Sequence, residues 1–541
     1  DADGKRAIDR AAEAGRWSLV AALDRAYPLP AALSEDADDD APLPDRAPTV
    51  LLRDGLRDGR AEELGGLAQL LSAKERGALL HDEDAIGSAQ RVRWLLAQGA
   101  DPEVRDPQGD TPVHAMLARM PEAETSLRAL LEHAVSPTGA GGLARFMASA
   151  QGNADADSLE GLALELLERG ADPFARSPAG DPPLALAVRL GWARLLDRLI
   201  ALGADLNARD SHGMSALHLA AALGRDGMLK RLVANGAAPD LLAADGQTPL
   251  GVALSSGRRD LADWLDWRGW PLPRRPLLAQ DIPAAAIVGD ADAVRRLLDL
   301  GLPVDATDSQ GCTALLRAAG GGHRAVVDLL LARGSDPQRT ANSGATPLSA
   351  AVSMRHADIV DRLLAAGAPL EQRLPGDLTV LMVACALGLT DLAARLLAAG
   401  ADVQACDAQG RQALHCAAMY GFNARERSRL VALFDTLLLA GVDADQPAAG
   451  ATPLLLLLGA RAEPGSDADE EVLVAGLQLL IDHEASLDAK DPRGFGPLHL
   501  AALHGLPRVV QFLLRAGADP DLRDALNRTP REIAVMRGFI D

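Results

Sequence analysis

The chain has 541 residues, of which 54 are Lys or Arg and 75 are Asp or Glu, so its net charge at pH 7 is −21. Hydrophobic residues make up 48% and charged residues 24%, which is typical of a folded protein. This negative charge repels nucleic-acid phosphates and anionic lipid headgroups, and an aromatic content of 3% is too small for base-stacking surfaces. We therefore expect no nucleic-acid partner and no direct membrane contact.

The four cysteines lie between residues 312 and 416, and no two have the Cys-x-x-Cys spacing of a zinc site or redox motif. We interpret them as small buried thiols, which favours a reducing cytoplasm. No apolar run approaches the roughly 20 residues that cross a bilayer. Because the chain begins with Asp1 rather than Met, we expect a piece of a longer protein. Secretion as an effector, or removal of an N-terminal anchor, stays open.

The chain contains an internal repeat. Residues 213–221 read Gly-Met-Ser-Ala-Leu-His-Leu-Ala-Ala, and residues 494–502 read Gly-Phe-Gly-Pro-Leu-His-Leu-Ala-Ala. The third residue of this pattern, called the anchor below, recurs every 33 residues over long stretches, as at Thr313, Thr346 and Thr379. About sixteen such units tile the chain, and a fixed period of this length is typical of proteins built from stacked supersecondary units.

Each unit predicts two helices. A Thr at the anchor caps the first, inner helix, and a following Pro, as in Thr346-Pro347, fits the first helical turn. An Ala pair such as Ala417-Ala418 lets inner helices of adjacent units approach closely, and a Gly nine residues after the anchor suits a left-handed helix end. The second, outer helix carries Leu pairs such as Leu396-Leu397, and a tight turn precedes the next anchor.

These columns resemble the ankyrin-repeat family, whose unit has this period and a Thr-Pro-Leu-His-x-Ala signature. Thr-Pro recurs at the anchors 111, 248, 346, 452 and 529. The resemblance implies an all-α fold with short β-hairpin or turn tips, in which about 15–16 helix pairs stack into an elongated curved superhelix. The dominance of Ala, Leu, Arg, Asp and Gly is associated with GC-rich codons and favours a long bacterial-type ankyrin-repeat protein.

The regularity of the units changes along the chain. Residues 1–77 are expected to be degenerate N-terminal repeats with an acidic loop at 34–45, and residues 78–541 the main array. The array is interrupted by an irregular insertion at 135–158, a Trp/Pro-rich break at 264–276, an acidic loop insertion at 461–471 and a half repeat at 527–541. The indoles of the break are expected to fill a gap between imperfectly stacked repeats, with a hinge or a docking site as the alternative.

Two smaller irregularities lie within the array. The interval of 65 residues between Thr248 and Thr313 fits one more, degenerate unit anchored near Gln280. A charged insertion, Arg425-Glu426-Arg427-Ser428-Arg429, is expected to lengthen an outer helix.

The histidines show no catalytic or metal-binding pattern. Five lie three residues after an anchor, where the family motif uses His for backbone and cap hydrogen bonds: His81, His114, His218, His415 and His499. The others form no pair at metal-ligand spacing, and the chain has no nucleophile elbow, P-loop or dinucleotide fingerprint. We expect no catalytic residue, no metal and no cofactor. An enzyme hidden between Leu33 and Ser158 is kept only as a reading to be excluded.

The resemblance also indicates a partner surface. In ankyrin-like stacks the turn tips and the residues just before the inner-helix Gly have no structural duty. The residues immediately before that Gly form a row without charged residues: Leu190, Leu223, Ser256, Val288, Gly321, Met354, Leu387, Tyr420 and His504. With Met419 and Leu378, the units from Thr346 to Gln412 are expected to present an apolar patch rimmed by Arg373, Gln409 and Arg411. The alternative is that these side chains pack onto adjacent repeats.

The sequence therefore predicts a monomeric, non-catalytic scaffold that binds a protein or peptide partner in its concave groove. Its candidate binding residues are Met354, Leu378, Leu387, Met419, Tyr420, Arg373, Gln409 and Arg411. Two alternatives stay open: an architectural spacer, and a segment of an ankyrin-type secreted effector.

Overall fold

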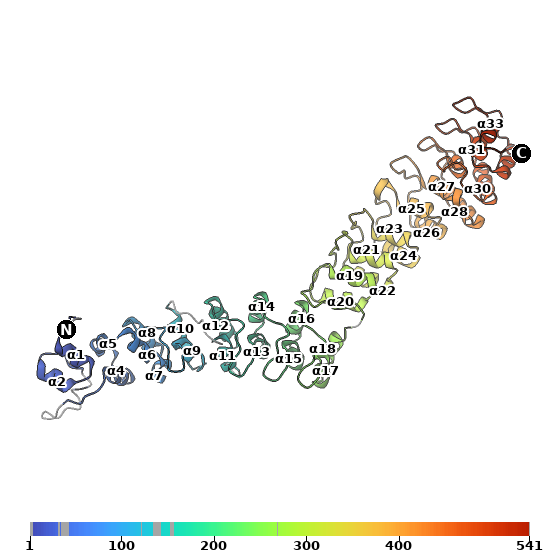
Figure 1. The fold of residues 1–541 in the computed structure, drawn as a ribbon. Coiled ribbons are helices and arrows are strands. Elements are labelled where there is room, and N and C mark those ends of the chain that lie inside the picture. The colour runs from blue at the N-terminus through green and yellow to red at the C-terminus, as the bar shows by residue number, and fades with distance from the viewer. Residues whose placement is uncertain are drawn as a thin grey trace. The chain divides into compact units, whose positions relative to one another are not determined.

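The computed structural model describes residues 4–30, 33, 43–120, 122–133, 142–151, 156–267 and 269–539. Its contacts divide the chain into two compact units, Asp1–Asp266 with Pro273–Pro276 and Trp267–Leu272 with Leu277–Asp541. Both units are stacks of short helix pairs (Figure 1). Of the acidic loop expected at 34–45, residues 34–42 lie outside the described residues. No helix in the described ranges is long and apolar enough to cross a lipid bilayer.

The helices of the first unit are α1 (Ala7–Glu13), α2 (Trp17–Leu23), α4 (Pro48–Arg57), η1 (Ala61–Glu63), α5 (Gly65–Leu70), α6 (Ala73–Ala78), η2 (Leu79–His81), α7 (Glu83–Ile86), α8 (Ala89–Ala97), α9 (Pro112–Leu117), α10 (Glu124–Leu131), α11 (Gly142–Ser149), α12 (Ala156–Glu168), α13 (Pro183–Leu190), α14 (Ala193–Ala201), α15 (Ala216–Ala222), α16 (Asp226–Ala234), α17 (Pro249–Ser255) and α18 (Arg259–Leu265).

The helices of the second unit are α19 (Asp281–Val288), α20 (Ala291–Asp299), α21 (Ala314–Gly321), α22 (Arg324–Ala332), α23 (Pro347–Ser353), α24 (Ala357–Ala365), η3 (Pro375–Asp377), α25 (Val380–Ala386), α26 (Thr390–Ala398), α27 (Ala413–Asn423), α28 (Arg427–Leu439), α29 (Pro453–Leu457), α30 (Glu470–Asp482), α31 (Pro497–His504), α32 (Pro507–Arg515) and α33 (Pro530–Met536).

The helices form two layers within each stack. In the second unit the inner helices α19, α21, α23, α25 and α27 pack each on the next, and outer helices pack likewise, as α20 on α22 and α22 on α24. The small residues Ala318 and Ala319 are fully buried in the inner layer, and Leu330 of the outer helix α22 is fully buried as well. Burying a Leu side chain contributes about 1.5–3 kcal/mol, so the stacking of neighbours supplies the core.

The inner helices begin and end where the sequence predicts. The hydroxyl of Thr313 accepts a hydrogen bond from the backbone N–H of Leu316 at 3.2 Å, and that of Thr346 accepts one from Ser349 at 3.0 Å. At the other end of α21, Gly322 adopts φ 76°, a left-handed conformation that side chains disfavour. The helix caps predicted from the anchor and Gly columns are thus confirmed.

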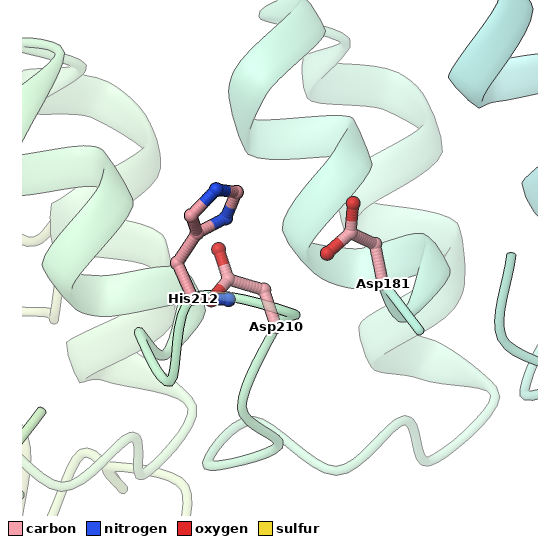
Figure 2. A group of neighbouring side chains, drawn as sticks. All are labelled: Asp181, Asp210 and His212. Carbon is pink, nitrogen blue, oxygen red and sulfur yellow. The ribbon is translucent and has the colours of Figure 1, made fainter. Parts of the chain in front are cut away.

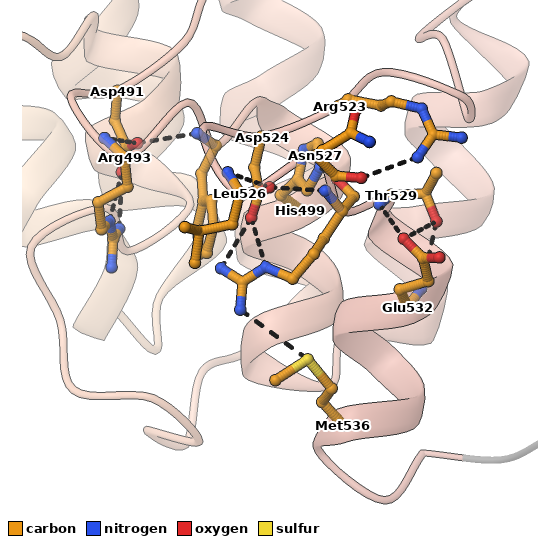
Figure 3. A network of polar contacts seen from close by, with 12 residues as sticks. Asp491, Arg493, His499, Arg523, Asp524, Leu526, Asn527, Thr529, Glu532 and Met536 are labelled. Atoms are coloured by element: carbon orange, nitrogen blue, oxygen red, sulfur yellow. Dashed lines mark hydrogen bonds and ion pairs between the residues drawn. The ribbon is translucent and has the colours of Figure 1, made fainter.

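An aspartate organises many of the turn tips. In the turn before α33, the Oδ1 atom of Asp524 accepts the backbone N–H groups of Leu526 and Arg528, at 2.9 and 2.7 Å (Figure 3). Its other oxygen accepts the Arg528 guanidinium at 2.8 Å. Asp407 holds its own turn in the same way through Arg411. Burial opposes the ionisation of Asp407, but these hydrogen bonds outweigh it and lower its pKa.

The tips contain only isolated β-bridges. One joins Arg209 to Ser215 and another joins Thr307 to Thr313, each across a turn. Among the described residues no longer strand or sheet occurs. The expected all-α repeat fold with short hairpin-like tips is therefore confirmed.

The irregular stretches keep the repeat plan where the structure describes them. Within 135–158, residues 142–149 form α11, which packs between α9 and α13 as an inner helix does. Gln280 is the residue that precedes α19, as the degenerate unit requires. The insertion at 425–429 yields a lengthened outer helix α28 of 13 residues, which packs on α30, also of 13 residues.

The tryptophans of the break make packing contacts. In the second unit the Trp267 indole N–H donates to the carbonyl of Trp270 at 2.8 Å, and the Arg296 guanidinium lies 5.4 Å from the Trp267 ring centroid. The backbone N–H of Trp270 donates to Asp290 at 2.8 Å. These contacts fix the start of the second unit to α20.

Replacing Asp407 tests the role of the tip aspartates. Asp407→Ala leaves two backbone N–H groups and the Arg411 guanidinium without their acceptor, so the free energy of unfolding should fall by about 1–3 kcal/mol. Urea unfolding followed by circular dichroism measures this loss. Asp361→Ala is the control, because the ion pair of Asp361 with Arg395 is exposed and is the one contact of its carboxylate among the described residues, and it should cost less than about 0.5 kcal/mol. Equal losses in the two variants would refute the role assigned to Asp407.

Candidate functional site

Two residues of the predicted patch project into solvent. Met354 and Leu387 each follow the last residue of an inner helix, α23 and α25 respectively. Their side chains are 59% and 40% exposed. Val288 occupies the corresponding position at the end of α19 and is 59% exposed. These three residues are called the apolar row below.

Three other residues of the patch are half-buried. The Tyr420 ring covers Gly388, so closely that a Cβ atom on Gly388 would lie 2.1 Å from the ring. Met419 accepts a hydrogen bond from Arg411 on its sulfur at 3.6 Å. Leu378 closes the tip before α25 by accepting the backbone N–H of Leu374 at 2.9 Å. The ring of Tyr420 therefore packs onto the adjacent repeat, the alternative that the sequence left open, whereas the contact of Met419 lies within its own repeat.

The three rim residues lie in the tips. Arg373 donates from Nη1 to the carbonyl groups of Asp377 and Cys406, both at 2.9 Å, and so ties two adjacent tips together. Arg411 forms an ion pair with Asp407 at 2.7 Å. Gln409 is exposed, and its backbone N–H donates to Asp407. Arg373 and Arg411 therefore also stabilise the conformation of the tips.

One exposed residue was missed by sequence reasoning. Ile287 directly precedes Val288 in α19 and is also more than half exposed. It lies one residue before the predicted row, so reading two adjacent columns instead of one would have found it. Ile287 and the apolar row are exposed and uncharged, as are Val535 and Met536 of α33 in the same unit.

The histidines three residues after an anchor make structural hydrogen bonds. The Nδ1 atom of His415 accepts the backbone N–H of Gln412 at 3.1 Å, and its Nε2–H donates to the carbonyl of Gln446 at 2.8 Å. His218 and His499 make the corresponding bonds in their own units. Each of these imidazoles ties a helix cap to the next tip, as the resemblance implied.

One cluster has the composition of a metal site. Asp181, Asp210 and His212 bring their ligand atoms within 4.8 Å of one another (Figure 2). The Arg189 guanidinium already donates to Asp181 at 2.8 Å and to Asp210 at 2.5 Å. A cation would have to displace this guanidinium, so the arrangement serves as an ion-paired link between two tips.

A groove with a volume of about 690 Å³ lies between α31, α32 and α33. Its lining is mostly aliphatic and includes Leu506, Val510, Leu514 and Ala534, together with the aromatic Phe539. Its polar lining residues, Gln511 and Arg531, form no cluster of acids, bases or nucleophiles. The groove therefore has the chemistry of a packing surface.

Comparisons with known proteins find ankyrin repeats along most of the second half of the chain and part of the first. Residues 146–243, 184–266 and 283–374 match a family model described as ankyrin repeats in three copies. Residues 381–438 and 480–534 match two models described as ankyrin repeats in many copies. Together the matches cover more than half of the chain.

Individual relatives align over shorter stretches. The chain is 32% identical over 165 residues to the mouse B-cell lymphoma 3 protein homolog, covering 25% of this chain and 35% of that protein. It is 38% identical over 65 residues to mouse ankyrin repeat family A protein 2, covering 12% and 21%. The crystal structure of the human ASB11 ankyrin repeat domain shares 26% identity at a TM-score of 0.37, covering 44% of this chain and 98% of that chain.

The chain therefore spans about a third or less of the length of these two curated relatives. The relatives come from mammals, so the bacterial source expected from the composition has no support among them.

The buried histidines predict how stability depends on pH. Burial lowers the pKa of His415 in the folded state, although its hydrogen bond to the Gln446 carbonyl opposes the shift. An unfolded histidine titrates near pH 6.5, so below that pH the unfolded chain takes up a proton that the folded site resists. The free energy of unfolding should therefore fall as the pH decreases from 7 to 5.

Urea unfolding at several pH values measures the slope of the free energy of unfolding against pH. His415→Gln should make the slope shallower, because one such proton uptake is removed. His483→Gln removes an exposed imidazole and serves as the control. A slope in the His415 variant as steep as in the wild type would contradict the assignment.

Proposed function

The chain belongs to the ankyrin-repeat family, and from that premise we propose that it is an interaction scaffold whose second unit binds a protein partner over the apolar row. Ankyrin repeats generally mediate protein–protein interactions, and their proteins are typically non-catalytic. The partner surface proposed here consists of Val288, Met354 and Leu387, together with Ile287.

The observation that carries this proposal is the exposure of the row. Thirty-three residues separate Met354 from Leu387, so they occupy equivalent places on α23 and α25, which pack side by side. Buried positions of the same helices, such as Val352 and Cys385, hold the stack together. Met354 and Leu387 contribute little to that core, so their apolar character is available for a partner.

Interface composition agrees with this proposal. Interface cores are depleted of charged residues and enriched in Met and aromatic residues. The row carries no charged residue, and Arg373 and Arg411 lie in tips of the same unit. Tyr420 can support the surface through its contact with Gly388, but its half-buried ring makes it a poor test residue.

The proposal is tested by a double substitution of exposed residues. Met354→Asp with Leu387→Asp should weaken binding of a purified partner by about ten-fold or more, because both charges would have to be desolvated in the interface. The partner is first captured from a lysate of the source organism with the intact chain, and its affinity is then measured by calorimetry. The matched control is Leu439→Asp, since Leu439 is 85% exposed at the end of the outer helix α28.

The outcomes separate the alternatives. Partner binding that survives the double substitution would remove the apolar row from consideration. Absence of any stoichiometric partner would favour the architectural spacer. Circular dichroism of each variant shows that the helices are retained.

A further inference from the structure

One position of the inner-helix Gly column holds an arginine. In three repeats of the second unit this position holds a glycine in the left-handed conformation: Gly289 after α19, Gly322 after α21 and Gly388 after α25. Their φ angles are 77°, 76° and 65°. The residue in this column after α23 is Arg355, and it adopts the same left-handed conformation, with φ 66°. A side chain in this region is disfavoured, because its Cβ atom crowds the backbone.

The backbone around Arg355 explains why the left-handed conformation is required. The N–H of Arg355 donates to the carbonyl of Val352 at 3.1 Å, and that of His356 donates to Ala351 at 2.9 Å. This pair of bonds is the Schellman motif, which ends a helix with one left-handed residue. Gly388 and Leu389 form the same pair of bonds at the end of α25. Glycine would therefore fit the site of Arg355 without strain.

Contacts within the chain do not offset this strain. The Arg355 side chain is exposed, and among the described residues no hydrogen bond or ion pair to its guanidinium is found. Some exposed arginines of the second unit do have carboxylate partners, as Arg333 has in Asp299 at 2.9 Å, whereas Arg373 donates to carbonyl groups instead. Backbone strain that the surrounding hydrogen bonds impose, as here, is concentrated at ligand-binding and switch regions.

Arg355 lies between an exposed apolar residue and a histidine that packs on the preceding repeat. Met354, which precedes it, belongs to the apolar row, and Leu387 holds the same position on the neighbouring helix. On the other side lie Gly321 and Gly322 of the preceding repeat, where the imidazole of His356 packs over Gly322 and its Nε2 lies 3.2 Å from the carbonyl oxygen of Gly320. The Arg355 cation therefore follows directly on the exposed apolar side chain of Met354.

We propose that Arg355 binds a carboxylate side chain of the partner, whose flanking apolar side chains cover Met354 and Leu387. This inference rests on the proposed function and specifies the partner's chemistry. The chain's net charge of −21 disfavours an acid-rich partner, so the segment bound is apolar with a single Asp or Glu. Its two apolar contacts lie about 10 Å apart, the spacing of packed helices.

The test uses a library of short random peptides displayed on phage and selected against the full chain. Selected peptides should carry one acidic residue among apolar ones. Their affinity, measured by fluorescence anisotropy, should fall about ten-fold or more for Arg355→Gly. The same substitution should raise the melting temperature, because Gly removes the strain, so weaker binding could not be attributed to unfolding.

Two controls make the comparison specific. Arg362→Ala removes a cation from the outer helix α24 of the same repeat, where it pairs with Asp328, and should bind the peptides like the wild type. Peptides with the acidic residue changed to its amide should bind the wild type and Arg355→Gly equally, since the ion pair is already lost.

The proposal is overturned if the selected peptides lack an acidic residue or bind Arg355→Gly as tightly as the wild type. If such peptides still lose affinity for Leu387→Asp, the proposed function stands and only the role of Arg355 is wrong. If no peptide is enriched, both are contradicted. Dimerisation of the free chain that Arg355→Gly abolishes would identify a second copy as the occupant instead, and the peptide proposal would be wrong.

Discussion

The whole architecture depends on the packing of each helix pair against the next one. A helix pair of this size cannot bury its apolar faces alone, so its stability comes from its neighbours. Small residues such as Ala318 and Ala319 permit close approach of the inner helices, and Leu330 fills the space behind them. Because the buried positions are fixed by this stacking, the exposed apolar positions Val288, Met354 and Leu387 recur at one place of the repeat, whereas Tyr420 and His504 of the same column are half-buried and buried.

Polar contacts set the spacing of the repeats that the apolar core holds together. The carboxylate of Asp407 holds its own tip, and the imidazole of His415 connects a helix cap to the next tip. Arg373 connects two successive tips through their carbonyl groups. Titratable residues that resemble catalytic or metal-binding groups therefore serve the scaffold. The same reasoning applies to Asp181 and Asp210, whose charges are neutralised by Arg189.

Much of the fold could be predicted from the sequence, because the repeat encodes its own caps. The Thr anchors, the left-handed glycines and the degenerate unit at Gln280 all follow from local backbone chemistry. The site was less predictable. Tyr420 and Met354 share a column, yet Tyr420 is half-buried over Gly388 while Met354 is exposed. The repeat column predicts the backbone position of a residue. The length of the side chain and the neighbouring residues determine whether that side chain is exposed or packs onto the stack. The left-handed backbone of Arg355 likewise became evident only in the structure.

The central claim, that partners dock on the apolar row, is tested most directly by NMR of the chain labelled with ¹³C at its nine methionine methyl groups. The Met354 signal reports on the apolar row. Met536 is 66% exposed and belongs to α33, so its signal reports on a distant part of the same unit. Addition of a bound partner or selected peptide should shift or broaden the Met354 signal and leave that of Met536 unchanged. An unchanged Met354 signal at saturating partner would contradict the account.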